Sequence, residues 1–70
     1  MKRWDKKINE YVESPKEIEK FLNEIEAVCK KYNLSICHED IGGAFMIENY
    51  DIINIEWLRD ASLNITKKNK

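Results

Sequence analysis

The sequence predicts an α+β domain in which a long helix and a C-terminal helix pack against a two-stranded β-hairpin. Apolar residues between positions 15 and 32 recur every three or four positions, which is the period of an amphipathic helix. Residues 34–48 instead alternate apolar and polar side chains on both sides of a Gly-Gly pair, which is typical of a hairpin. A second helical period follows Asp51. With 70 residues, the chain has room for one domain, 1–70.

The N-terminal segment, residues 1–13, allows two interpretations. Trp4, Ile8, Tyr11 and Val12 are spaced by three and four residues, which predicts a short N-terminal helix with one apolar face. The β-branched and aromatic residues around Tyr11 equally favour an extended strand. The local pattern does not choose between these two structures.

The long helix has clear start and stop signals. Ser14 is a typical N-cap, Pro15 suits the first helical position, and Glu17 stands three residues after the cap. We therefore expect the helix to begin at Pro15 and to end near Tyr32, because Asn33 readily takes the left-handed conformation that ends a helix. The side chains expected to face the core are Ile18, Phe21, Leu22, Ile25, Val28, Cys29 and Tyr32.

The hairpin register follows from the side-chain pattern. If Glu39 pairs with Ala44 across a four-residue loop, one face is apolar, and Gly42 or Gly43 supplies a positive φ in the turn. The apolar face then holds Leu34, Ile36, His38, Phe45, Ile47 and Asn49, and the mixed face holds Ser35, Cys37, Glu39, Ala44, Met46 and Glu48. We expect both helices to pack on the apolar face, with Trp57 beneath the hairpin.

Asp51 is the expected cap of the last helix. The stripe through Ile52, Ile55 and Leu58 continues to Ala61 or Ser62. Residues 64–70 form a basic tail without an apolar period, and we expect this tail to fray.

The net charge of −1 conceals an acidic body with basic ends. Residues 8–66 carry a net charge of −7, which does not attract nucleic-acid phosphates, so no direct nucleic-acid binding is expected. The basic ends are interpreted as solubilising; they are Lys2, Arg3, Lys6 and Lys7, followed by Lys67, Lys68 and Lys70. No secretory signal or bilayer-length apolar run is present, which predicts a soluble, cytoplasmic protein. Cys29 and Cys37 are expected to be buried free thiols rather than a disulfide.

His38, Glu39 and Asp40 are the residues that most resemble an acid-base or metal site. Neighbours along a strand point to opposite faces, so His38 and Glu39 diverge and do not readily bind one ion together. The two cysteines occupy apolar periodic positions, where a thiol is inert. We therefore expect no catalytic residues, no metal and no cofactor.

The turn is the candidate ligand site. Consecutive amides at Gly42 and Gly43 can form a concave anion-binding nest, and His38 can donate a hydrogen bond beside it. Glu39 and Asp40 oppose an anion unless they contact sugar hydroxyls or a base. The simpler alternative is that the two glycines only permit the turn.

Self-association is a further expectation. A two-stranded sheet is marginal alone and leaves strand edges that can pair with another chain. Trp4, Tyr11 and Met46 are the side chains expected at an interface, since aromatic residues are favoured interface anchors. A homo-oligomer is therefore predicted.

Two motifs carry a resemblance to a known group of proteins. The run from Lys31 to Glu48, of the form KYNLSI-x-HED-x-x-GAF-x-IE, and the later NIEWL at residues 54–58 resemble a family of small bacteriophage and prophage proteins. Similar sequences often carry a second histidine where this chain has Gly42, a departure that counts against a metal site in the turn. The resemblance implies a phage origin, and such accessory proteins commonly bind a host component, often one of an antiviral defence system.

Together these observations predict a non-enzymatic phage accessory protein that counters host defence in the bacterial cytoplasm. It would bind a defence protein, or sequester a small nucleotide-type signalling molecule at the hairpin turn. The alternatives are a small metal-binding protein or enzyme centred on His38, Glu39 and Asp40, and an acidic nucleic-acid mimic suggested by the charge of the body.

Overall fold

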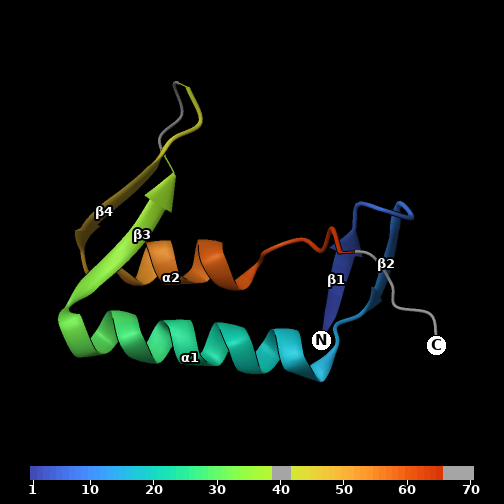
Figure 1. Cartoon of the computed structure of the whole chain (residues 1–70), viewed down its shortest axis with the longest axis horizontal. Helices are drawn as coiled ribbons and strands as arrows, with labels where there is room; N and C mark the ends of the chain where they lie inside the picture. Colours follow the sequence, from blue (N-terminus) through green and yellow to red (C-terminus); the bar gives the residue numbers. More distant parts are fainter. Residues whose placement is uncertain (39–41, 66–70) are drawn as a thin grey trace.

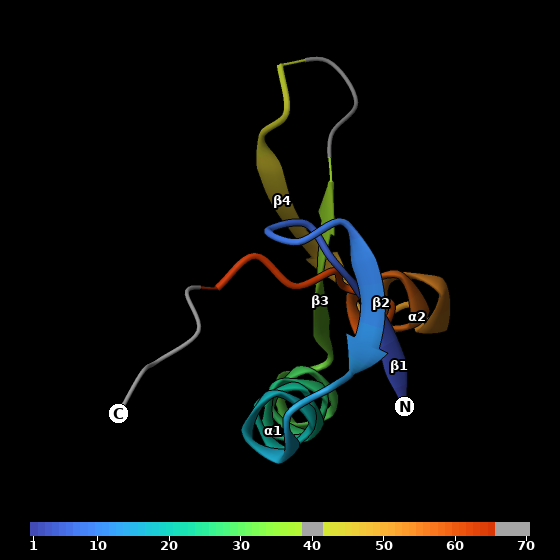
Figure 2. The ribbon, with the colours of Figure 1, turned by 90° about the vertical axis from the view of Figure 1, so that its right-hand side faces the viewer.

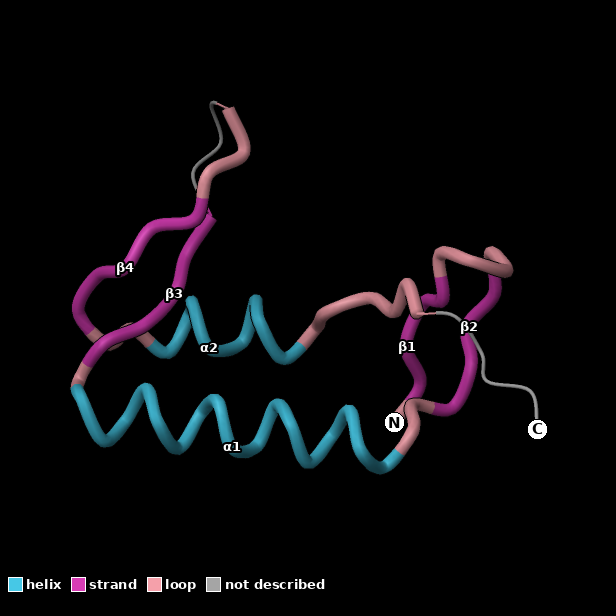
Figure 3. Tube along the Cα trace, in the orientation of Figure 1, coloured by secondary structure: helices cyan, strands magenta, loops and turns pink. Residues whose placement is uncertain are grey.

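The computed structural model describes residues 1–38 and 42–65, which form two helices and two β-hairpins, confirming the α+β class (Figure 1). The elements in chain order are β1 (Lys2–Asp5), β2 (Glu10–Glu13), α1 (Lys16–Tyr32), β3 (Leu34–His38), β4 (Phe45–Asn49) and α2 (Ile52–Arg59). The two helices lie side by side, with the β3–β4 hairpin at one end of the pair and the β1–β2 hairpin at the other (Figures 1 and 3). No helix in this described part of the chain is long and apolar enough to cross a membrane.

The N-terminal segment is a hairpin, so the predicted short helix is wrong and its extended alternative is correct. β1 pairs antiparallel with β2, and Trp4 lies opposite Tyr11. The turn is closed by the Asp5 carboxylate, which accepts a hydrogen bond from the Lys7 amide at 2.8 Å, and by Asn9, which takes a positive φ of 57°. The outer edge of β1 is also paired, because the Leu63 amide donates to the Trp4 carbonyl at 2.8 Å.

α1 begins at Lys16, one residue later than predicted, and Pro15 occupies the cap position without a side-chain cap. Ser14 does not cap the helix, because its hydroxyl oxygen instead accepts a hydrogen bond from Arg3 Nε at 3.2 Å. The predicted end is confirmed: Asn33 takes the left-handed conformation, with φ 58° and ψ 38°.

The β3–β4 register is the predicted one. Leu34 pairs with Asn49 and His38 with Phe45, the register that a Glu39–Ala44 pair extends, although Glu39 itself lies outside the described residues. Gly42 and Gly43 both have positive φ, 85° and 70°, as the turn requires.

The helices do not both pack on the apolar face of this hairpin, which corrects the prediction. α2 covers the mixed face instead: the side-chain amide Nδ2 of Asn54 donates to Ser35 Oγ at 3.0 Å and to Glu48 Oε2 at 2.7 Å. Ser35 and Cys37 are consequently buried, whereas Phe45 and Ile47 on the apolar face are 73% and 63% exposed. Because only two residues separate β4 from α2, the chain folds back onto the face that offers Asn54 polar partners.

α2 is capped as predicted and is shorter than predicted. The Asp51 carboxylate accepts a hydrogen bond from the Ile53 amide at 2.9 Å, and the helix ends at Arg59 instead of continuing to Ala61 or Ser62. Trp57 is only partly beneath the hairpin, because it is 44% exposed. The buried apolar side chains of the described residues are Leu22, Cys29, Cys37, Ile55 and Leu63. Both thiols are free and buried, as expected.

Arg3 joins the N-terminal hairpin to both helices. The sequence places it among solubilising basic residues, but its side chain is 1% exposed and forms an ion pair with Glu19 of α1, with Nε 2.8 Å from Oε2. Its Nη1 donates to the Ala61 carbonyl at 2.9 Å and to the Arg59 carbonyl at the end of α2. A guanidinium presents five donors in a fixed plane, so one side chain satisfies partners from three segments at once.

This network also sets the pKa of Glu19. Hydrogen bonds from Arg3 and then from Ser14 lower the pKa of the Glu19 carboxyl to about 2, against an ordinary value of 4.5. The charged carboxylate therefore belongs to the folded state, and its protonation favours unfolding.

Replacing Arg3 with leucine is expected to lower the free energy of unfolding by about 3 kcal/mol, because Glu19 and the carbonyls of Arg59 and Ala61 lose their buried partner. Urea denaturation measures this change. The matched control is Lys2→Leu on the same strand, where the exposed side chain predicts a change within about 0.5 kcal/mol. Equal effects of the two substitutions would contradict the assigned role of Arg3.

Acid should destabilise the fold partly through Glu19. Because the unfolded chain binds a proton near pH 4.5 and the folded chain only near pH 2, this stabilisation is complete above pH 4.5 and is lost as the pH falls toward 2. Thermal unfolding of Glu19→Gln should therefore depend less on pH across this window than that of the unsubstituted protein. Glu24→Gln, which changes an exposed carboxylate of the same helix, is the control that should keep the full pH dependence. If the thermal unfolding of Glu19→Gln depended on pH as steeply as that of the unsubstituted protein, the ion pair between Arg3 and Glu19 would be rejected as the source of this pH dependence.

Candidate binding surfaces

The described residues of the predicted ligand site, His38, Gly42 and Gly43, lie at the turn end of the β3–β4 hairpin. His38 ends β3, is exposed, and has its ring centroid 6.0 Å from that of Trp57 on α2. Gly42 and Gly43 lie in the turn, and the space around the Gly43 α-carbon is open. Glu39 and Asp40 lie outside the described residues. The structure therefore brings His38 together with Trp57, a pairing that the sequence pattern did not indicate.

The charge around this turn does not favour an anion. Residues 32–58 include no lysine or arginine, so a phosphate there would be held by backbone amides and His38 without a permanent cation. Within residues 1–38 and 42–65, no three side chains of the metal-binding types His, Cys, Asp and Glu come together.

The two cysteines are placed for packing. Cys29 lies on the inner side of α1 and Cys37 on the buried face of β3. Burial, followed by the neighbouring Glu48 carboxylate, raises the pKa of the Cys37 thiol. A raised pKa reduces the thiolate fraction, so this thiol is a poor nucleophile.

An exposed aromatic pair marks the other end of the molecule. Trp4 and Tyr11 face each other across β1 and β2, with ring centroids 5.2 Å apart and planes at 71°, an edge-to-face arrangement. Tyr11 is 67% exposed and Trp4 is 36% exposed. The sequence predicted both as interface residues, and the hairpin that it did not firmly predict brings them into contact.

A small polar cleft adjoins this aromatic pair. Its volume is about 230 Å³, and it is lined by Met1, Lys2, Arg3, Trp4, Tyr11, Asp60 and Ser62. The terminal ammonium of Met1 forms an ion pair with Glu13 at 2.6 Å, which lowers the pKa of the Glu13 carboxyl. We call Trp4, Tyr11 and this cleft the aromatic site.

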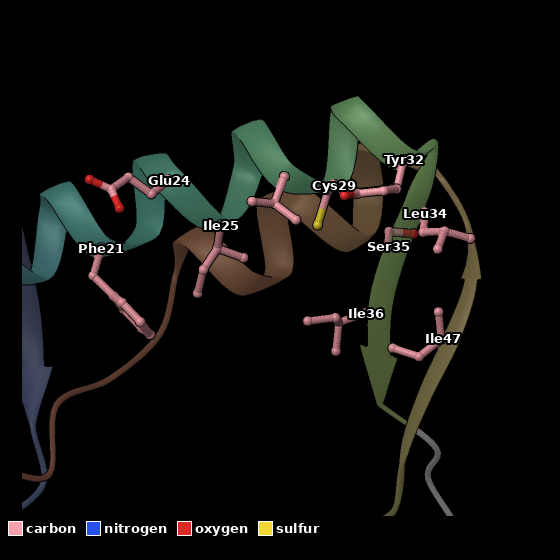
Figure 4. A pocket seen from close by; sticks show the side chains of 10 residues that line it. Phe21, Glu24, Ile25, Cys29, Tyr32, Leu34, Ser35, Ile36 and Ile47 are labelled. Carbon is pink, nitrogen blue, oxygen red and sulfur yellow. The ribbon is translucent and has the colours of Figure 1, made fainter.

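The third surface is an apolar groove between α1 and the β3–β4 hairpin. Figure 4 shows Phe21 and Ile25 of α1 and Ile36 of β3 directed into the same space. The groove has a volume of about 420 Å³, and Glu24 is the one charged residue in its lining. Figure 2, which looks along α1, shows the hairpin standing upright from the end of this helix.

We define the apolar face as the exposed hydrophobic side chains that border this groove or continue beyond it on the same hairpin face. They are Phe21 (60% exposed), Val28 (54%), Tyr32 (62%), Leu34 (42%), Phe45 (73%) and Ile47 (63%). The sequence placed the three α1 members in the core. Met46, the third predicted interface residue, is 43% exposed but pairs with Cys37 on the opposite hairpin face, so it joins neither surface.

Comparisons with protein-family models, with curated proteins and with solved structures find no match to this chain.

The thiols should resist alkylation while the protein is folded. Single-cysteine variants, Cys29→Ser and Cys37→Ser, should each react with a maleimide only slowly near neutral pH and rapidly after denaturation in urea, because the remaining thiol is buried. Labelling is followed by intact-mass spectrometry. Rapid alkylation of the thiol in folded Cys29→Ser would contradict the buried position and raised pKa of Cys37.

Proposed function

We propose that this chain is a non-enzymatic binding protein that docks on another protein through the aromatic site. The observation that carries the proposal is the exposed Trp4–Tyr11 pair beside a cleft lined by charged and polar groups. Tryptophan and tyrosine dominate the energetic hot spots of interfaces, and a polar surround is typical of partners that also exist apart.

The nature of the partner is supported by the resemblance of the KYNLSI and HED motifs to small phage proteins. On that basis the partner is a host protein of an antiviral defence system, and the complex forms in the bacterial cytoplasm. Docking of this kind would counter the defence by covering a surface that the host protein needs.

A protein partner is better supported than a sequestered nucleotide. Residues 32–58 carry no lysine or arginine to balance phosphate charge at the hairpin turn, whereas the cleft of the aromatic site is lined by Lys2 and Arg3 together with Asp60 and neutral residues. Mixed charge beside an aromatic centre suits a protein surface, which also carries both signs of charge.

The test is capture of a partner from a bacterium that carries a defence system. The tagged chain should retain a host protein, and Trp4→Ser or Tyr11→Ser should weaken that binding by about thirtyfold or more, since hot-spot truncations typically cost about 2 kcal/mol or more. Binding is then measured with the purified partner.

The control for this experiment is Ile53→Ser, which removes an apolar side chain as exposed as Tyr11 from α2, outside the lining of the aromatic site. Circular dichroism checks that each variant is folded. Equal binding by all three variants would reject the aromatic site. Release of a nucleotide from the denatured protein, with no protein captured, would favour sequestration at the turn and overturn the docking proposal.

A further inference from the structure

We propose that the apolar face is the contact between two copies of this chain, which form a homodimer about a two-fold axis. This inference does not depend on the proposed function, because the apolar face is formed by α1 and the β3–β4 hairpin, whereas the aromatic site is centred on the β1–β2 hairpin at the other end of the helix pair (Figure 1).

The first observation is that the apolar stripe of α1 is only partly covered within one chain. Leu22 and Cys29 are buried, but Phe21, Val28 and Tyr32 on the neighbouring side of the same helix are more than half exposed. The hairpin adds Leu34, Phe45 and Ile47, so hydrophobic side chains from α1, β3 and β4 face solvent around or beside one groove. Contiguous exposed apolar surface of this kind marks an interaction site in a soluble protein.

The available area matches what a dimer needs. Aromatic side chains present about 150–250 Å² each when fully exposed, and aliphatic ones somewhat less, so the six members of the face offer roughly 600 Å² per chain. A standard interface buries about 800 Å² per partner. Specific interfaces begin at about 600 Å² per partner, so the area of one chain suffices for a contact at the small end of this range.

The composition of the face favours a second copy over a different protein. Permanent homodimer interfaces are more apolar than interfaces between proteins that also exist apart. The groove carries one charged residue, Glu24, whereas the aromatic site combines charged and polar groups. A second copy of the chain is present wherever the protein is produced. The apolar face can therefore be covered without a different protein.

The shape of the face is compatible with two-fold pairing. Phe45 is its most exposed member and lies beyond the groove lining, because its pair with His38 is two pairs nearer the turn than the Ile36–Ile47 pair. One surface thus holds both a projecting aromatic ring and a hollow lined by apolar side chains. In an isologous contact, Phe45 of each copy enters the groove of the other, which satisfies both features at once.

β4 adds backbone groups to this contact. In the described part of the chain its backbone is paired with β3 alone, and its sequence, Phe-Met-Ile-Glu-Asn, contains neither of the edge-protecting residues lysine and proline. Its single charged side chain, Glu48, is held by Asn54 on the opposite face. A second copy can therefore approach this edge without meeting an opposing cation or a proline.

The mass of the protein in solution is the first test. Light scattering coupled to gel filtration should give twice the chain mass of 8.4 kDa at micromolar concentration, and the melting temperature should rise with protein concentration. Phe45→Asp and Ile47→Lys should shift the protein to monomer or to an unfolded chain. Tyr11→Ser, which changes an exposed aromatic ring at the other end, should remain dimeric.

A photo-crosslink locates the contact even if those variants unfold. With p-benzoylphenylalanine in place of Phe45, and a mixture of light and ¹⁵N-labelled protein, crosslinks should join unlike chains and map to residues 21–32. Monomer mass at every concentration would overturn the dimer. Crosslinks confined to one chain, or a dimer that Phe45→Asp and Ile47→Lys leave intact, would overturn the assignment to the apolar face.

Discussion

The ion pair and hydrogen bonds of Arg3 are the interaction on which the arrangement of this small chain depends. The guanidinium is nearly inaccessible to water. It binds Glu19 of α1, the carbonyl of Arg59 at the end of α2, and the carbonyl of Ala61 just beyond that helix. A buried guanidinium without these partners would be strongly unfavourable, so the N-terminal hairpin, the start of α1 and the end of α2 are held in one geometry. The bridge between Asp5 and Leu63 lies in the same region and closes the outer edge of β1.

This constraint places two chemically different surfaces at the two ends of the helix pair. At the Arg3 end, β1 and β2 direct Arg3 inward and therefore Trp4 and Tyr11 outward, because successive side chains on a strand alternate. At the other end, α2 packs on the mixed face of the β3–β4 hairpin through Asn54, which leaves the apolar face open toward α1. The aromatic site, with its charged and polar groups, suits a transient partner, and the apolar face suits a permanent contact.

Much of the local structure was predictable from the sequence, because it depends on short-range signals. The turn glycines, Asn33 at the end of α1 and Asp51 at the start of α2 act within a few residues, and alternation specifies the hairpin register. The packing was not predictable. Arg3 stands in a basic run, and its carbonyl partners lie 56 and 58 residues away. Asn54 likewise appears as an ordinary helix residue until Ser35 and Glu48 are placed beside it. The aromatic site depends on the β1–β2 hairpin. The apolar residues of this segment are also spaced as in a helix, so the sequence alone did not identify the hairpin.

The account holds that the apolar face is covered by a second copy while the aromatic site remains open to another partner. Amide hydrogen exchange at two protein concentrations measures both surfaces at once. On dilution, exchange should become faster in the groove-lining part of α1 and in β4, whereas the amides of β1 and β2 should keep their rates. Exchange that is independent of concentration throughout, or a change confined to β1 and β2, would contradict this division of the surface.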